Sequence, residues 1–139
     1  MDHPGRKLAA IYAGGVVGAL LRVGLAEEFP PAAGAWPWPT FAVNLLGALL
    51  LGYFYALTRD HPAERLQHPF LATGVCGTLT TFSTMQLELY ELVDGGAAGL
   101  AAAYCAATLV AGYLLLRVGI TLEARWPGRG ARGPAEAAR

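Results

Sequence analysis

The sequence GVCGTLTTFST, residues 74 to 84, decides how the rest of this chain is interpreted. It belongs to a stretch that carries no charge, yet it is crowded with glycine and with the hydroxyl side chains Thr78, Thr80, Thr81, Ser83 and Thr84. Glycine and β-branched threonine are both weak helix formers. We therefore expect an apolar helix that is broken near residues 77 to 80.

Outward from this stretch, charged residues are absent from four segments: residues 8 to 21, 36 to 58, 66 to 87 and 95 to 116. The chain is 55% hydrophobic and only 14% charged, whereas soluble domains are about 25% charged. A helix of about 22 residues is roughly 33 Å long and crosses a hydrocarbon core of about 30 Å. The first segment continues past Arg22 to Ala26. These patterns predict an all-α membrane protein with four transmembrane helices, at about residues 8–26, 36–58, 67–93 and 95–120.

The spans are close together in sequence, so residues 1–126 are expected to form a single four-helix membrane domain. Residues 127–139 are rich in Gly, Pro and Arg and are expected to be a disordered tail. The formal net charge of zero argues against a nucleic-acid partner, because such proteins carry a basic patch. No Ser/His/Asp or metal-ligand constellation lies at one depth, so neither an enzyme nor an organic cofactor is expected.

The positive charges are placed unevenly across the four predicted spans. Of the ten Lys and Arg residues, all but Arg22 lie in the N-terminus, the second loop and the C-terminal end: Arg6, Lys7, Arg59, Arg65, Arg117, Arg125, Arg129, Arg132 and Arg139. With four spans these segments share one side of the membrane. The positive-inside rule then places both termini in the cytoplasm, with dual topology as the alternative. We expect the chain to be a multi-pass protein of the plasma membrane.

Polar groups inside the spans are the functional candidates, because an unsatisfied polar group in hydrocarbon costs several kcal/mol. In the first span Gly14, Gly18 and Arg22 share one face. The glycines are expected to pack against another helix. Arg22 either extends toward the lipid headgroups or lies at a pore mouth, where it concentrates anions. In the second span, Asn44 lies one turn after Thr40 and either bonds two helices together or donates to an anion.

A break in the third span would free backbone carbonyls and amides at mid-membrane depth. That is tolerable only where protein or an ion satisfies them, the alternative being an ordinary kink satisfied by threonine side chains. Gly77 is expected to let the backbone open, because it has no Cβ. Beyond the break, Phe82, Met85 and Glu88 recur every third residue and are expected to line a slowly rotating face.

Three segments together resemble the small CrcB/Fluc family of fluoride ion channels: GGVVGALLR (residues 14 to 22), NLLGALLLG (44 to 52) and GVCGTLTTFST (74 to 84). The similarity covers roughly residues 8 to 120. It implies an antiparallel, dual-topology dimer of four-helix subunits embedded in the lipid bilayer, with two narrow fluoride pathways. The implied function is passive export of cytoplasmic fluoride, which confers fluoride resistance.

The resemblance also implies roles for individual residues. A structural sodium ion (Na+) at the dimer centre would be held by the main-chain carbonyls of Gly77 and Thr80. The fluoride path would be lined by Arg22, Thr40, Asn44, Phe82, Ser83, Thr84, Met85, Glu88, Tyr104 and Thr108. Two positions depart from the family: Met85 stands where a second phenylalanine is usual, and Gly112 where the fourth-helix polar track usually ends in serine.

Two other functions are compatible with four small spans. A proton-coupled multidrug transporter needs a membrane-embedded carboxylate, for which Glu88 is the candidate, although the first span carries Arg22 instead. A non-transporting assembly subunit would not need a broken helix. The uneven charge leaves open whether the dimer partner is a second copy or an oppositely oriented paralogue.

Overall fold

The computed structural model describes residues 4–29, 32, 34–58, 66 and 68–124. Their regular elements are all helical: α1 (Pro4–Glu28), α2 (Trp38–Thr58), η1 (Pro69–Cys76), α3 (Gly77–Leu79), α4 (Phe82–Asp94) and α5 (Ala98–Ala124). The prediction of an all-α chain is therefore confirmed for these residues. The tail at 127–139, predicted to be disordered, lies outside the described residues.

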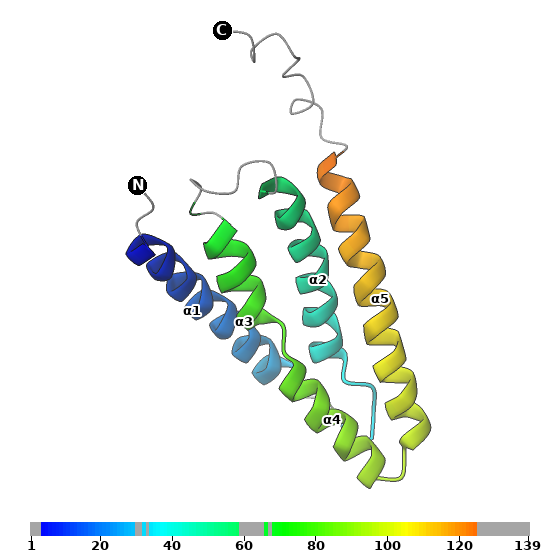
Figure 1. Cartoon of the computed structure of the whole chain (residues 1–139). Helices are drawn as coiled ribbons and strands as arrows, with labels where there is room; N and C mark the ends of the chain where they lie inside the picture. Colours follow the sequence, from blue (N-terminus) through cyan, green and yellow to red (C-terminus); the bar gives the residue numbers. More distant parts are fainter. Residues whose placement is uncertain (1–3, 30–31, 33, 59–65, 67, 125–139) are drawn as a thin grey trace, which may run out of the picture.

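The helices make four passes along the molecule, and α1 begins at the same end of the bundle at which α5 finishes (Figure 1). Three of these helices, α1, α2 and α5, are long and apolar enough to cross a membrane. The third pass, between α2 and α5, is divided among η1, α3 and α4. A membrane protein with four helical passes, one of them bent, fits this arrangement.

The break predicted for the third span is present, and it opens at Thr80 and Thr81. Both residues are extended, with ψ 150° at Thr80 and φ −144°, ψ 120° at Thr81. Gly77 is helical, with φ −66° and ψ −22°, so the prediction that Gly77 opens the backbone is wrong. The β-branched threonines favour extended backbone, and the Thr81 hydroxyl caps α4 by accepting the N–H of Thr84 at 3.1 Å.

The first helix packs closely on η1 and α3, as predicted from its glycines. A Cβ at Gly14 would overlap the carbonyl oxygen of Phe70, and one at Gly18 would overlap the hydroxyl of Thr78. The same hydroxyl donates to the Gly15 carbonyl at 2.9 Å. Small residues let two backbones approach in a membrane, where packing and hydrogen bonds drive association. This contact fixes α1 beside η1 and α3, the part of the divided pass that precedes the break.

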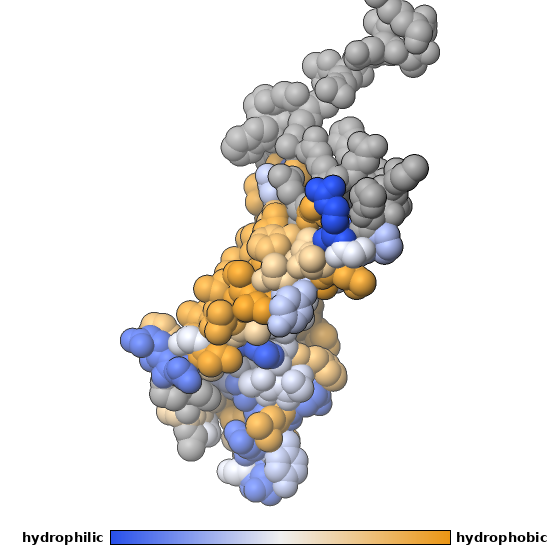
Figure 2. All heavy atoms as spheres, turned by 90° about the vertical axis from the view of Figure 1, so that its left-hand side faces the viewer, coloured by the Kyte–Doolittle hydropathy of each residue, from blue (hydrophilic) through white to orange (hydrophobic). Residues whose placement is uncertain are grey.

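A second close contact joins α2 to α5. A Cβ at Gly52 would overlap the carbonyl of Leu116, and one at Gly119 would overlap the carbonyl of Leu49. On the outside, large hydrophobic side chains such as Leu20 and Leu109 are more than half exposed. Figure 2 shows a broad apolar band on the side of the molecule that faces left in Figure 1, with hydrophilic residues gathered below it. Such a surface suits contact with lipid.

Candidate functional site

A carboxylate held by two hydroxyl groups lies inside the helix bundle. Thr40 of α2 donates to one Glu88 oxygen at 2.5 Å, and Tyr104 of α5 donates to the other at 2.8 Å. All three side chains are buried, Tyr104 completely. One turn along α5, the Thr108 hydroxyl donates to the Tyr104 carbonyl at 2.8 Å. Because Thr40 lies on α2 and Tyr104 on α5, Glu88 ties α2, α4 and α5 together.

Asn44 of α2 holds the extended segment of the third pass through a pair of hydrogen bonds. Its side-chain oxygen accepts the N–H of Thr81 at 2.9 Å, and its amide nitrogen donates to the carbonyl of the same residue at 3.2 Å. Of the two predicted roles of Asn44, the structure shows the first: the side chain bonds α2 to the third pass. A carboxamide has two N–H donors, so the second remains available to a ligand.

The two carbonyls that the resemblance assigns to sodium have lost their helical donors. In a continuous α-helix, the Gly77 and Thr80 carbonyls would accept the N–H groups four residues later. The N–H of Thr81 instead donates to Asn44, and that of Thr84 donates to the Thr81 hydroxyl. Backbone oxygens of this kind suit a small hard cation.

Threonine hydroxyls do not replace the missing donors at these two carbonyls. The Thr78 hydroxyl donates to Gly15 and lies 3.0 Å from the Gly74 carbonyl, and the Thr80 hydroxyl donates to Cys76 at 2.8 Å. The hydroxyls therefore satisfy carbonyls of α1 and η1 rather than those of Gly77 and Thr80. An ordinary kink satisfied by threonines does not describe the groups at Gly77 and Thr80.

Four of the residues assigned to the fluoride path line one hollow of about 330 Å³, between the end of α1, the start of α2 and the break. They are Arg22, Thr40, Ser83 and Thr84, and Thr81 joins them. The Thr81 hydroxyl donates to that of Thr84 at 2.9 Å, which leaves the Thr84 hydrogen free to donate elsewhere. A guanidinium on a wall of hydroxyls attracts anions, so the position of Arg22 favours the pore-mouth interpretation.

Phe82, Met85 and Glu88 do not share a face in the single chain. Phe82 is 71% exposed, whereas Met85 and Glu88 are buried, and Met85 packs in the apolar core beside Tyr104. Three residues advance a helix by about 300°, so Phe82 and Glu88 point about 120° apart. The expected row of three therefore turns from the outer surface into the bundle.

The role of Thr81 is not predicted from the sequence, where this residue counts only as one of the hydroxyls. Its backbone and side chain make four hydrogen bonds at the break. The available signal was a threonine directly before an apolar helix, which is a typical N-cap. Its pairing with Asn44 joins residues 37 positions apart and has no local signature.

Comparisons with known proteins agree on one family. The family model described as "CrcB-like protein, Camphor Resistance (CrcB)" matches residues 9–120. A Mycobacterium bovis protein named fluoride-specific ion channel FluC 1 is 45% identical over 125 residues, which are 89% of this chain and 95% of that protein. Fluoride-specific ion channel FluC 2 of Nocardia farcinica is 40% identical over 126 residues, covering 90% and 89%.

A more distant relative extends the same similarity. The Bacteroides fragilis protein named fluoride-specific ion channel FluC is 33% identical over 118 residues, which are 82% of this chain and 93% of that protein. The matched region includes every helix that forms the hollow and the break. The chain belongs to the CrcB-like family.

Proposed function

We propose that this protein is a fluoride-selective ion channel that exports cytoplasmic fluoride passively and so confers fluoride resistance. The observation that carries the proposal is the hollow beside the broken helix, which is lined by Arg22 together with Thr40, Ser83 and Thr84. Relatives from three genera carry the name fluoride-specific ion channel. These names and the donor-rich hollow support the same function.

The residues suit a small, tightly hydrated anion. A pore for fluoride must replace water with closely spaced donors, and hydroxyl and carboxamide groups supply them. Arg22 raises the local anion concentration at the hollow, and the second N–H of Asn44 is a donor deeper in the membrane. The edge of the Phe82 ring is electropositive and offers a further contact. Chloride is larger and fits such a donor set poorly.

The driving force needs no coupled energy source. Hydrogen fluoride crosses membranes as a neutral molecule, dissociates in a near-neutral cytoplasm and is trapped there as the anion. An inside-negative membrane potential then favours exit by about 2.3 kcal/mol per charge for each 100 mV. A multidrug transporter would instead need a carboxylate that exchanges protons for a cation, whereas both oxygens of Glu88 accept hydrogen bonds from buried hydroxyls.

The functional unit in this proposal is an antiparallel dimer with a second copy or an oppositely oriented paralogue. The 71% exposure of Phe82 and the exposure of Gly77 in the single chain leave both residues free to meet a partner. The Gly77 and Thr80 carbonyls of two subunits would hold one structural sodium ion, which would neutralise their dipoles and join the subunits. The charge distribution places both termini in the cytoplasm for one orientation of the chain.

Fluoride efflux from liposomes tests the function directly. Vesicles containing the purified chain and loaded with potassium fluoride should release fluoride to an ion-selective electrode when valinomycin is added. Chloride-loaded vesicles should release little, and equal fluxes of the two anions would refute the proposal.

A matched pair of variants tests the role of the hollow. Arg22→Gln should slow efflux several-fold, most strongly at low ionic strength, because electrostatic attraction is screened by salt. Arg6→Gln, which removes an exposed charge from the opposite end of α1, should leave the rate unchanged. If both variants behave alike, Arg22 does not concentrate fluoride at the pore mouth.

A further inference from the structure

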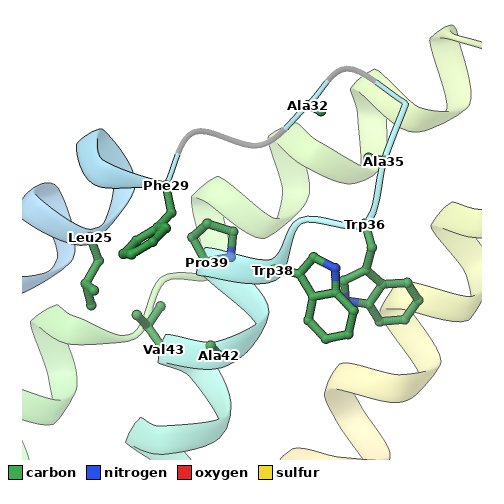
Figure 3. A pocket seen from close by; sticks show the side chains of 9 residues that line it. All are labelled: Leu25, Phe29, Ala32, Ala35, Trp36, Trp38, Pro39, Ala42 and Val43. Carbon is green, nitrogen blue, oxygen red and sulfur yellow. The ribbon is translucent and has the colours of Figure 1, made fainter.

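A second, larger hollow lies beside the first one, on the side away from the break. Its volume is about 530 Å³, and it is bounded by the end of α1, by the start of α2 and, between these helices, by Ala32, Ala35 and Trp36. Figure 3 shows Leu25 and Phe29 on one side of it, facing Pro39 and Val43 on the other. Leu25, Pro39 and Val43 also line the hollow that contains Arg22, so these three side chains separate the two spaces.

The lining of this hollow is apolar and favours an apolar ligand. Its walls are aliphatic and aromatic, and its outer side chains Phe29 and Trp38 are 59% and 66% exposed. Water occupies polar cavities and avoids apolar ones, and an empty space would cost its lining their packing contacts. A volume of this size is typical of a site for a small molecule. In a membrane-spanning chain the surrounding apolar fluid is the acyl chains of lipid.

The electrostatics at the rim select the headgroup. Glu27 and Glu28, two and three residues after Leu25, are exposed. Glu91 and Asp94 are exposed at the end of α4, which lies at the same end of the bundle (Figure 1). Among the described residues, Arg22 is the one cation near this end, and it faces the other hollow. An acidic rim attracts an ammonium group and repels an anionic headgroup.

Two indole rings mark the level of the lipid headgroups at this hollow. The ring of Trp36 lies 5.9 Å from that of Trp38, a largely exposed side chain on the rim. Tryptophan is enriched where acyl chains meet headgroups. The pair therefore indicates that a lipid in the hollow has its headgroup at this end of the bundle.

We propose that this hollow binds one phospholipid with an ammonium headgroup, of the phosphatidylethanolamine class. An acyl chain lies against Leu25, Phe29 and Val43, and the ammonium group lies beside Glu27 and Glu28. The bound chain backs the three side chains that separate the Arg22 hollow from the bilayer. The binding site does not depend on the proposed function, although this sealing role does.

Tryptophan quenching by brominated lipids tests the site. In a Trp126→Phe background, the fluorescence comes from Trp36 and Trp38, both in the wall of the hollow. At equal mole fractions, phosphatidylethanolamine with brominated acyl chains should quench more strongly than phosphatidylglycerol with the same chains. The double variant Glu27→Gln, Glu28→Gln should lower this preference toward parity. Equal quenching by the two lipids in the background protein would overturn the proposal.

A filled hollow provides the matched control. Ala42→Phe places a ring inside the hollow and should abolish the lipid preference, whereas Ala102→Phe on the exposed surface of α5 should retain it. Ala35→Leu provides a second filling variant if Ala42→Phe does not fold. Absence of quenching by both lipids would mean that a second copy of the chain covers the hollow, which also refutes the proposal. Fluoride efflux from the same vesicles reports separately whether the channel function holds.

Discussion

Replacing Asn44 by alanine tests how the broken pass is held in shape. The side chain makes two hydrogen bonds to the backbone of Thr81, at 2.9 and 3.2 Å. Alanine removes both. The Thr81 carbonyl, as the N-cap of α4, still accepts the first hydrogen bond of that helix. The N–H of Thr81 loses its partner, and the extended backbone there, with φ −144° and ψ 120°, gives it no helical replacement. Asn44→Ala should therefore destabilise the fold in addition to stopping fluoride flux.

The size of the loss follows from the one backbone donor left without a partner, the N–H of Thr81. Hydrogen bonds between membrane helices contribute about 0.6 kcal/mol on average and up to about 1.7 kcal/mol. A buried backbone group left without a partner costs about 1–3 kcal/mol. Loss of this one partner should lower the free energy of unfolding by about 1–3 kcal/mol. At about 1.4 kcal/mol for each factor of ten, the ratio of folded to unfolded protein falls by roughly 5- to 140-fold.

Two measurements on the same variants separate stability from conduction. The free energy of unfolding is obtained by titrating the protein from mild detergent into denaturing detergent and following helix content, and fluoride efflux is measured in liposomes. Leu46→Ala is the control, because Leu46 lies on the same helix and is 46% exposed. If Asn44→Ala is no less stable than Leu46→Ala yet conducts no fluoride, Asn44 acts on the ion alone and the bracing argument is wrong.

Three further predictions address the helix contact, the aromatic position and the sodium site. Gly18→Val should lower the free energy of unfolding by about 1–3 kcal/mol, because its Cβ would overlap Thr78. Gly24→Val is the control, since open space surrounds its Cβ, and it should have little effect in the same unfolding titration. Phe82→Ile should reduce fluoride efflux far more than Met85→Leu, a substitution of similar volume at a buried position; equal losses would show that Met85 replaces the second aromatic ring. Gly77→Val should leave helix content intact, since open space surrounds Gly77 in the single chain, but should abolish dimers in cross-linking, and replacing all sodium by a large organic cation should do the same; a dimer that survives both treatments would refute the sodium site.

The sequence alone determined the number of passes, the position of the break within a few residues and the family. Passes are predictable because each uncharged segment must be long enough to cross hydrocarbon, a property of composition and length. The break is predictable because glycine and threonine are locally weak helix formers. Gly14 and Gly18 were correctly assigned to packing because their spacing places both on one face of a helix.

The tertiary structure decided which groups meet. The opening lies at Thr80 and Thr81 rather than at Gly77, because Asn44 of another helix takes the backbone hydrogen bonds of Thr81. Glu88 is held by Thr40 and Tyr104, which lie 48 and 16 residues away. Partners so distant depend on which helices are neighbours and how each is rotated about its axis. Local propensity and periodicity contain neither quantity, so the contacts of these polar groups are visible only in the folded chain.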